Sequence, residues 1–124
     1  MKGLGIDMVS ISGTRALIDS IGETYADGIY TLAERMESEK AMDCAEYFAE
    51  RFAVKEALFK ALAHLLEEKT FDLRIVETLD DADGCPCITR SPELEGLLGQ
   101  AGASELFVSI TTEDDAATAI VAVQ

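Results

Sequence analysis

The segment from Tyr47 to Leu62 constrains the fold most strongly, because it has the pattern of one long amphipathic helix. Apolar residues in and around it recur at the spacing of one helical face; they are Ala45, Phe48, Ala49, Phe52, Phe59, Ala63 and Leu66. Glu56 falls within this stripe, and Lys60 follows one turn later at its edge. An unpaired carboxylate on a packing face costs several kcal/mol, so Glu56 is expected to need a cation or hydrogen-bond donors.

The length of 124 residues predicts one domain over residues 1–124, large enough to bury a core. Nearly half of the residues, 48%, are apolar, but no run is long enough to predict a transmembrane helix. The first residues pass directly into a short strand pattern without the apolar core of a signal peptide. A cytosolic location is therefore expected.

Charge restricts the partners. The chain has 24 acidic against 10 basic residues, a net charge of −14, spread along its length. Nucleic acid and anionic membrane surfaces are not expected as partners of such a chain, because both attract basic proteins. An anionic ligand would need a local device: a metal ion, a helix N-terminus or a few placed cations.

Neither the cysteines nor the single histidine indicates a site. The chain has three cysteines, Cys44, Cys85 and Cys87, and an odd number does not suggest a disulfide framework. No second pair of Cys or His residues completes a zinc site with Cys85 and Cys87, so reduced thiols are expected. His64 has no partner in the sequence for a catalytic triad.

Residues 2–9 alternate as a strand, with Leu4, Ile6 and Met8 on one face and Asp7 on the other. Gly3 and Gly5 clear the face of Asp7, which suits close approach by another chain or a ligand. Three helices are expected next: one over 13–21 capped by Ser12, one over 23–39, and the central helix from a cap at Asp43 to Lys69. A strand over 71–78, an acidic turn over 80–84 and a short strand over 86–90 follow. The chain is then expected to form a helix from Ser91-Pro92 to about 99–102 and two strands, over 106–111 and 117–123, joined at 113–115. This order predicts an α+β fold, with a mainly antiparallel sheet packed on the long central helix.

Asp7 and Glu56 are the two acids that the pattern marks as misplaced. Two hard oxygen ligands from separate elements, completed by water and a phosphate-bearing substrate, commonly hold Mg²⁺. The alternative is structural: Glu56 pairs with Lys60 or Lys55, while Asp7 caps an element or faces solvent. In the same way, Arg51, Lys55 and Lys60 can form an ordinary salt-bridged helix face.

Several stretches together resemble one family, the holo-acyl-carrier-protein synthases, which are small phosphopantetheinyl transferases. The stretches are Gly3-Leu-Gly-Ile-Asp7-Met-Val9-Ser-Ile11, Arg51-Phe-Ala-Val-Lys55-Glu56-Ala-Leu-Phe-Lys60-Ala-Leu62, the strand and Gly-x-Pro turn from Val76 to Pro86, and the closing hairpin from Val108 to Val123. The Arg-Phe-Ala-x-Lys-Glu-Ala core is the most specific of them. The match covers nearly the whole chain in order.

The resemblance implies transfer of the 4'-phosphopantetheine arm of coenzyme A to a serine of an apo acyl carrier protein. Asp7 and Glu56 would bind Mg²⁺ together with the pyrophosphate of coenzyme A. Lys60 would assist proton transfer or bridge the pyrophosphate. All three would thus act in catalysis.

The resemblance also assigns supporting residues and an assembly. Arg51 and Lys55 would contact phosphates or the carrier, and the turn containing Gly84 and Pro86 would contact the nucleotide. The family forms homotrimers with sites between subunits, so a homotrimer is expected.

Three departures from the family pattern are visible. The central helix is expected to continue through Ala63 to Leu66, where the family turns with Gly-Thr-Gly, and Thr112 stands where the family often has histidine. The charge of −14 would repel an acidic carrier at long range, which indicates a less acidic carrier or a narrow basic docking strip. A non-catalytic relative that binds a nucleotide or a protein is the alternative function.

Overall fold

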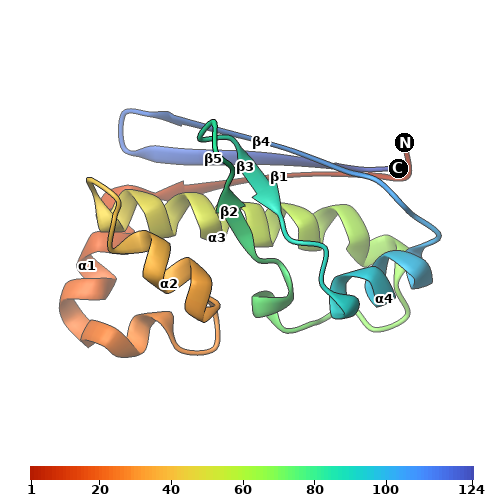
Figure 1. Cartoon of the computed structure of the whole chain (residues 1–124), viewed down its shortest axis with the longest axis horizontal. Coiled ribbons are helices and arrows are strands. Elements are labelled where there is room, and N and C mark those ends of the chain that lie inside the picture. The colour runs from red at the N-terminus through yellow and green to blue at the C-terminus, as the bar shows by residue number, and fades with distance from the viewer.

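A three-stranded antiparallel sheet lies along one long helix, and shorter helices surround the rest of that helix (Figure 1). The computed structural model describes all 124 residues. Its elements are β1 (Gly3–Ser10), α1 (Ile11–Ile21), α2 (Leu32–Ser38), α3 (Cys44–Leu62), β2 (Thr78–Asp80), β3 (Pro86–Ile88), α4 (Pro92–Ala101), β4 (Leu106–Glu113) and β5 (Ala116–Val123), with 3₁₀ turns at Gly22–Ala26, Ala63–Leu65 and Leu73–Ile75. The predicted α+β class and antiparallel sheet are confirmed.

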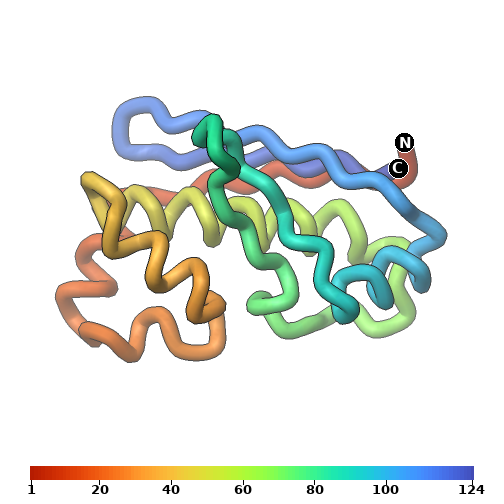
Figure 2. Tube along the Cα trace, viewed as in Figure 1, coloured from red at the N-terminus to blue at the C-terminus, as the bar shows by residue number.

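The main sheet has the order β1-β5-β4, so the first strand of the chain lies beside the last (Figure 2). Gly3 is opposite Val123, and Asp7 is opposite Ala119. β4 and β5 form the expected hairpin, although both strands are longer than predicted, and Asp114 at the turn has a positive φ of 54°. β2 and β3 form a separate two-stranded sheet.

The backbone of β1 lies directly against the backbone of α3. A Cβ atom built on Gly5 would lie 1.8 Å from the carbonyl oxygen of Ala57, and one on Gly3 would lie 2.0 Å from that of Ala61. Only glycine fits where two backbones approach so closely. The two glycines therefore serve the contact with α3.

The expected apolar stripe on the central helix is wrong in one respect. α3 is covered on several sides, and most of its fully buried apolar residues lie outside the stripe: Ala53, Val54, Ala57, Leu58, Ala61 and Leu62. Within the stripe, only Ala49 is equally buried. Phe52, Glu56 and Phe59 lie on its less buried side. The many alanines of α3 let the sheet and neighbouring helices pack around it, so no single stripe defines its buried face.

Two predicted elements form only in part. A continuous helix over 23–39 is wrong: the chain leaves the 3₁₀ turn at Gly22–Ala26 through Gly28, which has a φ of +77°, and helix restarts as α2 at a capping box of Thr31 and Glu34. The strand over 71–78 is also wrong. This segment contains a 3₁₀ turn, and the strand forms only from Thr78 to Asp80.

The central helix ends earlier than predicted. α3 ends at Leu62 and a single 3₁₀ turn follows, so the expected continuation to Lys69 is wrong. The ammonium group of Lys69 donates hydrogen bonds to the carbonyl oxygens of Ala63 and Leu66, as a cation at a helix C-terminus can do. The chain thus turns at this position without the glycines usual in the family.

The expected helix caps at Asp43 and Ser91-Pro92 are confirmed, whereas the first helix is capped by Ser10 and not by Ser12. All three cysteines are free and exposed. None of the helices combines the length and apolar character needed to cross a membrane.

The β1–α3 contact predicts a large cost for any side chain at Gly5. Gly5→Ala should lower the free energy of unfolding by about 2 kcal/mol or more, because Cβ meets backbone that cannot move aside. Urea unfolding followed by circular dichroism measures this change.

Gly96→Ala is the matched control. Gly96 lies within α4, nothing lies within 4 Å of a Cβ there, and alanine favours a helix by about 0.5–1 kcal/mol. The control should therefore be neutral or stabilising. Equal midpoints for Gly5→Ala and the unsubstituted protein would contradict the assigned contact.

Candidate active site

Asp7 and Lys60 form an ion pair that joins the sheet to the central helix. The Lys60 ammonium donates to Asp7 Oδ1 at 3.0 Å and to the carbonyl oxygen of Ile6 at 3.0 Å. The Asp7 side chain is 17% exposed and that of Lys60 is 51% exposed. Because Gly5 brings β1 against α3, Asp7 faces the helix side chain that binds it.

Glu56 lies one turn before Lys60 on α3 and shares this site. Burial raises the pKa of Glu56 above its ordinary value, the charge of Asp7 raises it further, and Lys60 lowers it. No hydrogen bond contributes to the shift. Two carboxylates thus lie close together, with Lys60 bound to Asp7, and Glu56 has no hydrogen-bond donor of its own.

The arrangement of the cations contradicts the structural alternative for Glu56. Lys60 pairs with Asp7, whereas Lys55 pairs with Glu34 at 2.8 Å. Asp7 neither caps an element nor simply faces solvent. The two acids marked by the sequence pattern therefore lie together, with Lys60 beside them.

Lys55 and Arg51 are turned away from this cluster. Lys55 is completely buried, and its ammonium group donates to Glu34 and to the carbonyl oxygens of Leu73 and Val76. The Arg51 side chain, 3% exposed, donates to Glu37 and Asp80. Their contacts are those of residues inside the fold, and this arrangement does not favour direct contact with phosphates.

The turn containing Gly84 and Pro86 lies on another side of the molecule. Gly84 is exposed and has a φ of +80°, the left-handed region that favours glycine. β3 begins at Pro86 and lies beside β4, where the two strands line a shared surface pocket. Asp7 is on β1, at the opposite edge of the main sheet. Within one chain, this turn and the Asp7–Glu56 cluster lie at different sheet edges.

His64 and Thr112 have ordinary structural contacts. His64 is exposed and donates from Nε2 to the carbonyl oxygen of Lys2 at 3.0 Å. Thr112 donates to Glu50 Oε2 at 3.0 Å. Neither residue lies in the acidic cluster.

Sequence reasoning missed Glu34 and Glu37, the acids that hold the buried cations. The signal for Glu34 was present, because Thr31 followed three positions later by glutamate is the pattern of a capping box. No local signal marks Glu37, whose partners come from α3 and β2.

No group of three or more histidine, cysteine, aspartate or glutamate side chains is placed to hold a metal ion. Asp7 and Glu56 provide two carboxylates, a suitable protein contribution for Mg²⁺, which keeps several waters and substrate phosphates as ligands. The exposed side of the cluster leaves room for such ligands. The residues present therefore fit this metal when an anionic substrate completes its shell.

Comparison with known proteins identifies the family. The model of the 4'-phosphopantetheinyl transferase superfamily matches residues 3–121. The chain belongs to this superfamily. The transferase is 35% identical over 124 residues to a holo-[acyl-carrier-protein] synthase from Thiobacillus denitrificans, covering all of this chain and 94% of the relative. The family resemblance recognised in the sequence is confirmed.

Solved structures agree with this assignment. A holo-[acyl-carrier-protein] synthase from Neisseria meningitidis superposes on the transferase with a TM-score of 0.88 at 30% identity, covering 100% of this chain and 98% of the other. The synthase of Chronobacterium ammoniagenes in complex with coenzyme A gives a TM-score of 0.78 at 26% identity, covering 96% and 93%. The fold of the transferase is thus that of known holo-acyl-carrier-protein synthases.

The charges around Glu56 predict opposite responses to two substitutions in the metal-free transferase. Asp7→Asn removes a nearby negative charge and should lower the pKa of Glu56, whereas Lys60→Met removes a positive charge and should raise it. Carboxyl-carbon NMR titration measures both changes.

Glu95 is the internal control, because Arg90 lowers its pKa independently of this site. Its titration should be the same in both variants. A Glu56 pKa that does not respond to Asp7→Asn would show that the two carboxylates do not interact.

Proposed function

We propose that this chain transfers the 4'-phosphopantetheine arm of coenzyme A to a serine of an apo acyl carrier protein. The observation that carries this proposal is the pairing of Asp7 with Glu56 across the β1–α3 contact, with Lys60 hydrogen-bonded to Asp7. This arrangement suits phosphoryl transfer, in which catalysis is mainly positioning and stabilisation of charge. The activity is also the one for which the relatives are named.

In the proposed reaction, the serine Oγ forms a bond to the phosphorus that carries the pantetheine arm. The P–O bond within the pyrophosphate breaks, and adenosine 3',5'-bisphosphate leaves with the electron pair. The serine hydroxyl gives up its proton. Glu56, whose carboxylate accepts no hydrogen bond from the protein, is placed to help receive it.

Asp7 and Glu56 would hold Mg²⁺ together with the pyrophosphate oxygens. When bound, the ion neutralises charge on the transferring phosphoryl group and on its leaving oxygen. Lys60 lies beside both acids and is half exposed, so its ammonium group can also donate to a pyrophosphate oxygen. A chain of charge −14 needs such a local positive site to bind a polyanion.

Arg51 and Lys55 act from within the fold in this proposal. Both are buried and bound to acids, so they support the elements around the site and do not contact phosphate. Gly84 and Pro86 contact the nucleotide of coenzyme A. They lie at a different sheet edge from Asp7, so the nucleotide bound near one Asp7 would meet the turn of a neighbouring copy.

A homotrimer would supply that neighbour. One face of the main sheet points away from α3. Over residues 4–8 of β1 and the positions paired with them on β5 and β4, this face has no charged side chain. Its residues are Leu4, Ile6, Met8, Phe107, Ser109, Thr111, Thr118, Ile120 and Ala122. Ile6 is 56% exposed and Phe107 is 52% exposed. An apolar sheet face of this kind marks a protein interface. We assign it to two further copies of the chain.

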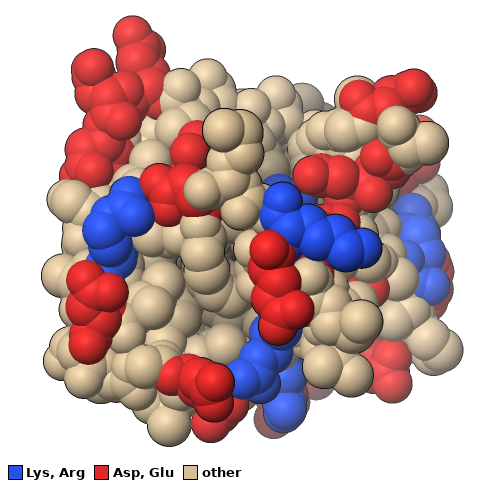
Figure 3. Space-filling model, turned by 60° about the vertical axis from the view of Figure 1, so that its left-hand side comes forward, with Lys and Arg blue, Asp and Glu red and all other residues tan.

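The carrier is proposed to have a less acidic docking face than usual. Each of the four surface arginines is already paired with an acid: Arg15–Asp43, Arg35–Asp27, Arg74–Asp72 and Arg90–Glu95. Figure 3 shows basic patches that lie next to acidic ones, with no continuous basic strip on that face. Pairing weakens the attraction for an acidic partner. The cytosol, where free carriers and coenzyme A meet, is the proposed location.

The transfer itself is tested by incubating the protein with coenzyme A, Mg²⁺ and apo carrier proteins from the same source. Mass spectrometry should show the carrier gaining one phosphopantetheine arm. Asp7→Ala and Glu56→Ala should each abolish this gain and the Mg²⁺-dependent binding of coenzyme A measured by calorimetry. Glu68→Ala, at an exposed acid outside the cluster, should leave both unchanged.

A failure to modify any carrier, with intact folding, would remove the transferase proposal. It would favour the alternative of a non-catalytic relative that binds a nucleotide or a protein. Unchanged calorimetry in both alanine variants would instead remove Asp7 and Glu56 from the site.

The proposed assembly predicts that Ile6→Lys disrupts the trimer. The side chain is exposed in the single chain, so a lysine there costs little in the monomer but places a charge within the interface. Light scattering should show three times the chain mass of 13.4 kDa for the unsubstituted protein and one chain mass for the variant. Met42→Lys, at a fully exposed methionine outside the sheet, should remain trimeric.

A further inference from the structure

Two glutamates of α2 bind both the central helix and the edge of β2. Glu34 and Glu37 are one turn apart, so their side chains lie on the same face of the helix. Glu34 is completely buried and accepts from Lys55 of α3 at 2.8 Å. The Glu37 side chain is 26% exposed and accepts from Arg51 of α3 at 3.1 Å.

The same carboxylates accept hydrogen bonds from the backbone of β2. The N–H of Thr78 donates to Glu34 Oε2 at 3.0 Å, and the N–H of Asp80 donates to Glu37 Oε2 at 3.2 Å. Alternate N–H groups of a strand point to the same side. The side of β2 that does not face β3 is therefore bound by carboxylates in place of a third strand.

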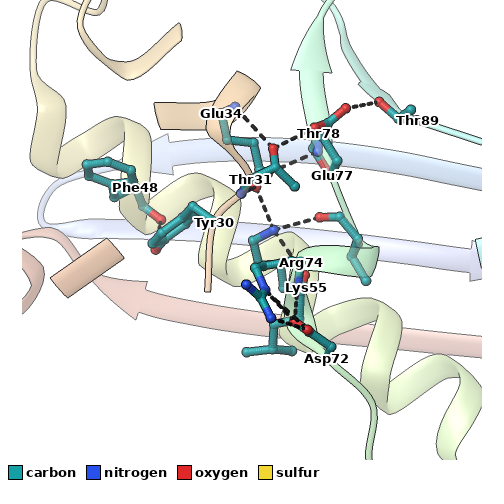
Figure 4. Close-up of polar contacts among 12 residues, drawn as sticks. Tyr30, Thr31, Glu34, Phe48, Lys55, Asp72, Arg74, Glu77, Thr78 and Thr89 are labelled. Atoms are coloured by element: carbon teal, nitrogen blue, oxygen red, sulfur yellow. Dashed lines mark hydrogen bonds and ion pairs between the residues drawn. The ribbon is translucent and has the colours of Figure 1, made fainter. Parts of the chain in front are cut away.

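This support matters because β2 and β3 have only three residues each. An isolated two-stranded hairpin is marginally stable at best. The segment before β2 is also held by α3, because the Lys55 ammonium donates to the carbonyl oxygens of Leu73 and Val76 (Figure 4). The hairpin therefore gets its position from α2 and α3 more than from its own pairing.

Glu77 extends the same network toward α2 and β3. Its carboxylate accepts from the hydroxyl of Thr31, the cap of α2, and from the hydroxyl of Thr89, which follows β3 (Figure 4).

Burial alone would raise the pKa of Glu37, but hydrogen bonds from Tyr47 and Arg51 lower it below its ordinary value. Glu37 is thus held as an anion in this network.

The turn at the far end of the hairpin contains Gly84 and Pro86. Asp80 is both the last residue of β2 and the partner of Pro86 in the strand pair. Arg51 also binds the Asp80 carboxylate at 2.8 Å. Any change in how Glu37 holds Asp80 is therefore transmitted directly to the start of the turn.

We propose that Glu34 and Glu37 are positioning residues for coenzyme A binding, because they hold the β2–β3 hairpin so that its Gly84–Pro86 turn meets the nucleotide. This inference rests on the proposed function, in which that turn contacts the nucleotide. It gives the buried ion pairs Glu34–Lys55 and Glu37–Arg51 a role in substrate affinity and none in the chemical step.

Glu37→Gln tests the proposal at the less buried of the two acids. Hydrogen–deuterium exchange on the free protein should show faster exchange of the Asp80 amide and of the turn over 81–85. The KM for coenzyme A should rise about tenfold, as for loss of one hydrogen bond to a charged group, while kcat stays within about twofold. Glu39→Gln, at an exposed acid just after the end of α2, should change neither the exchange rate nor the KM.

A second variant guards against a folding defect in the first. Asp80→Asn removes the negative charge that Arg51 binds on the hairpin and leaves Glu37 unchanged, so it should also raise the KM for coenzyme A, by a smaller factor. Unchanged exchange at Asp80 and the turn in Glu37→Gln would overturn the proposal. An unchanged KM in Glu37→Gln would also overturn it. So would a fall in kcat of this variant that is accompanied by a fall in its unfolding midpoint.

The exchange measurement needs no substrate and the arm-transfer assay uses the unsubstituted protein. An inactive unsubstituted protein would therefore remove the proposed function, while an active one with an unaffected Glu37→Gln variant would remove only this inference.

Discussion

The contact between the backbones of β1 and α3, made possible by Gly3 and Gly5, determines the geometry of the candidate site. It places the strand residue Asp7 within hydrogen-bonding distance of Lys60 on the helix, close enough to Glu56 to perturb it. Neither acid could form the cluster from its own element. A side chain at Gly5 would separate strand from helix and would move the two carboxylates apart. Packing and chemistry thus depend on the same two glycines.

Features written in local sequence were predicted well. The caps at Asp43 and Ser91 and the β4–β5 hairpin need only nearby residues, and the structure contains all of them. Asp7 and Glu56 lie close together, as a shared site requires, but their role as metal ligands stays a prediction. The sequence-based prediction for Glu56 assumed a buried stripe, whereas the structure places this residue on the less buried side of α3.

What could not be predicted depends on contacts between distant segments. The segment over 71–78 has a strand-like composition, yet the buried ammonium of Lys55 binds its carbonyl oxygens and holds it in a different conformation. The end of α3 was missed for a similar reason. The Lys69 ammonium donates to the carbonyl oxygens of Ala63 and Leu66 just after the helix, so the helix ends there without a glycine. Both errors arose from lysines whose partners are backbone carbonyls, which no side-chain pattern reveals.

The pairing of β1 with β5 has a consequence for how the protein is made. The strand that carries Asp7 is synthesised before its hydrogen-bonding partner β5, whose Val123 lies opposite Gly3. Until then, β1 has the helix below it and no strand beside it. Contacts so far apart in sequence slow folding. The acidic cluster therefore becomes fixed only after β5 has been synthesised, and a nascent chain shortened before β5 would lack a formed site.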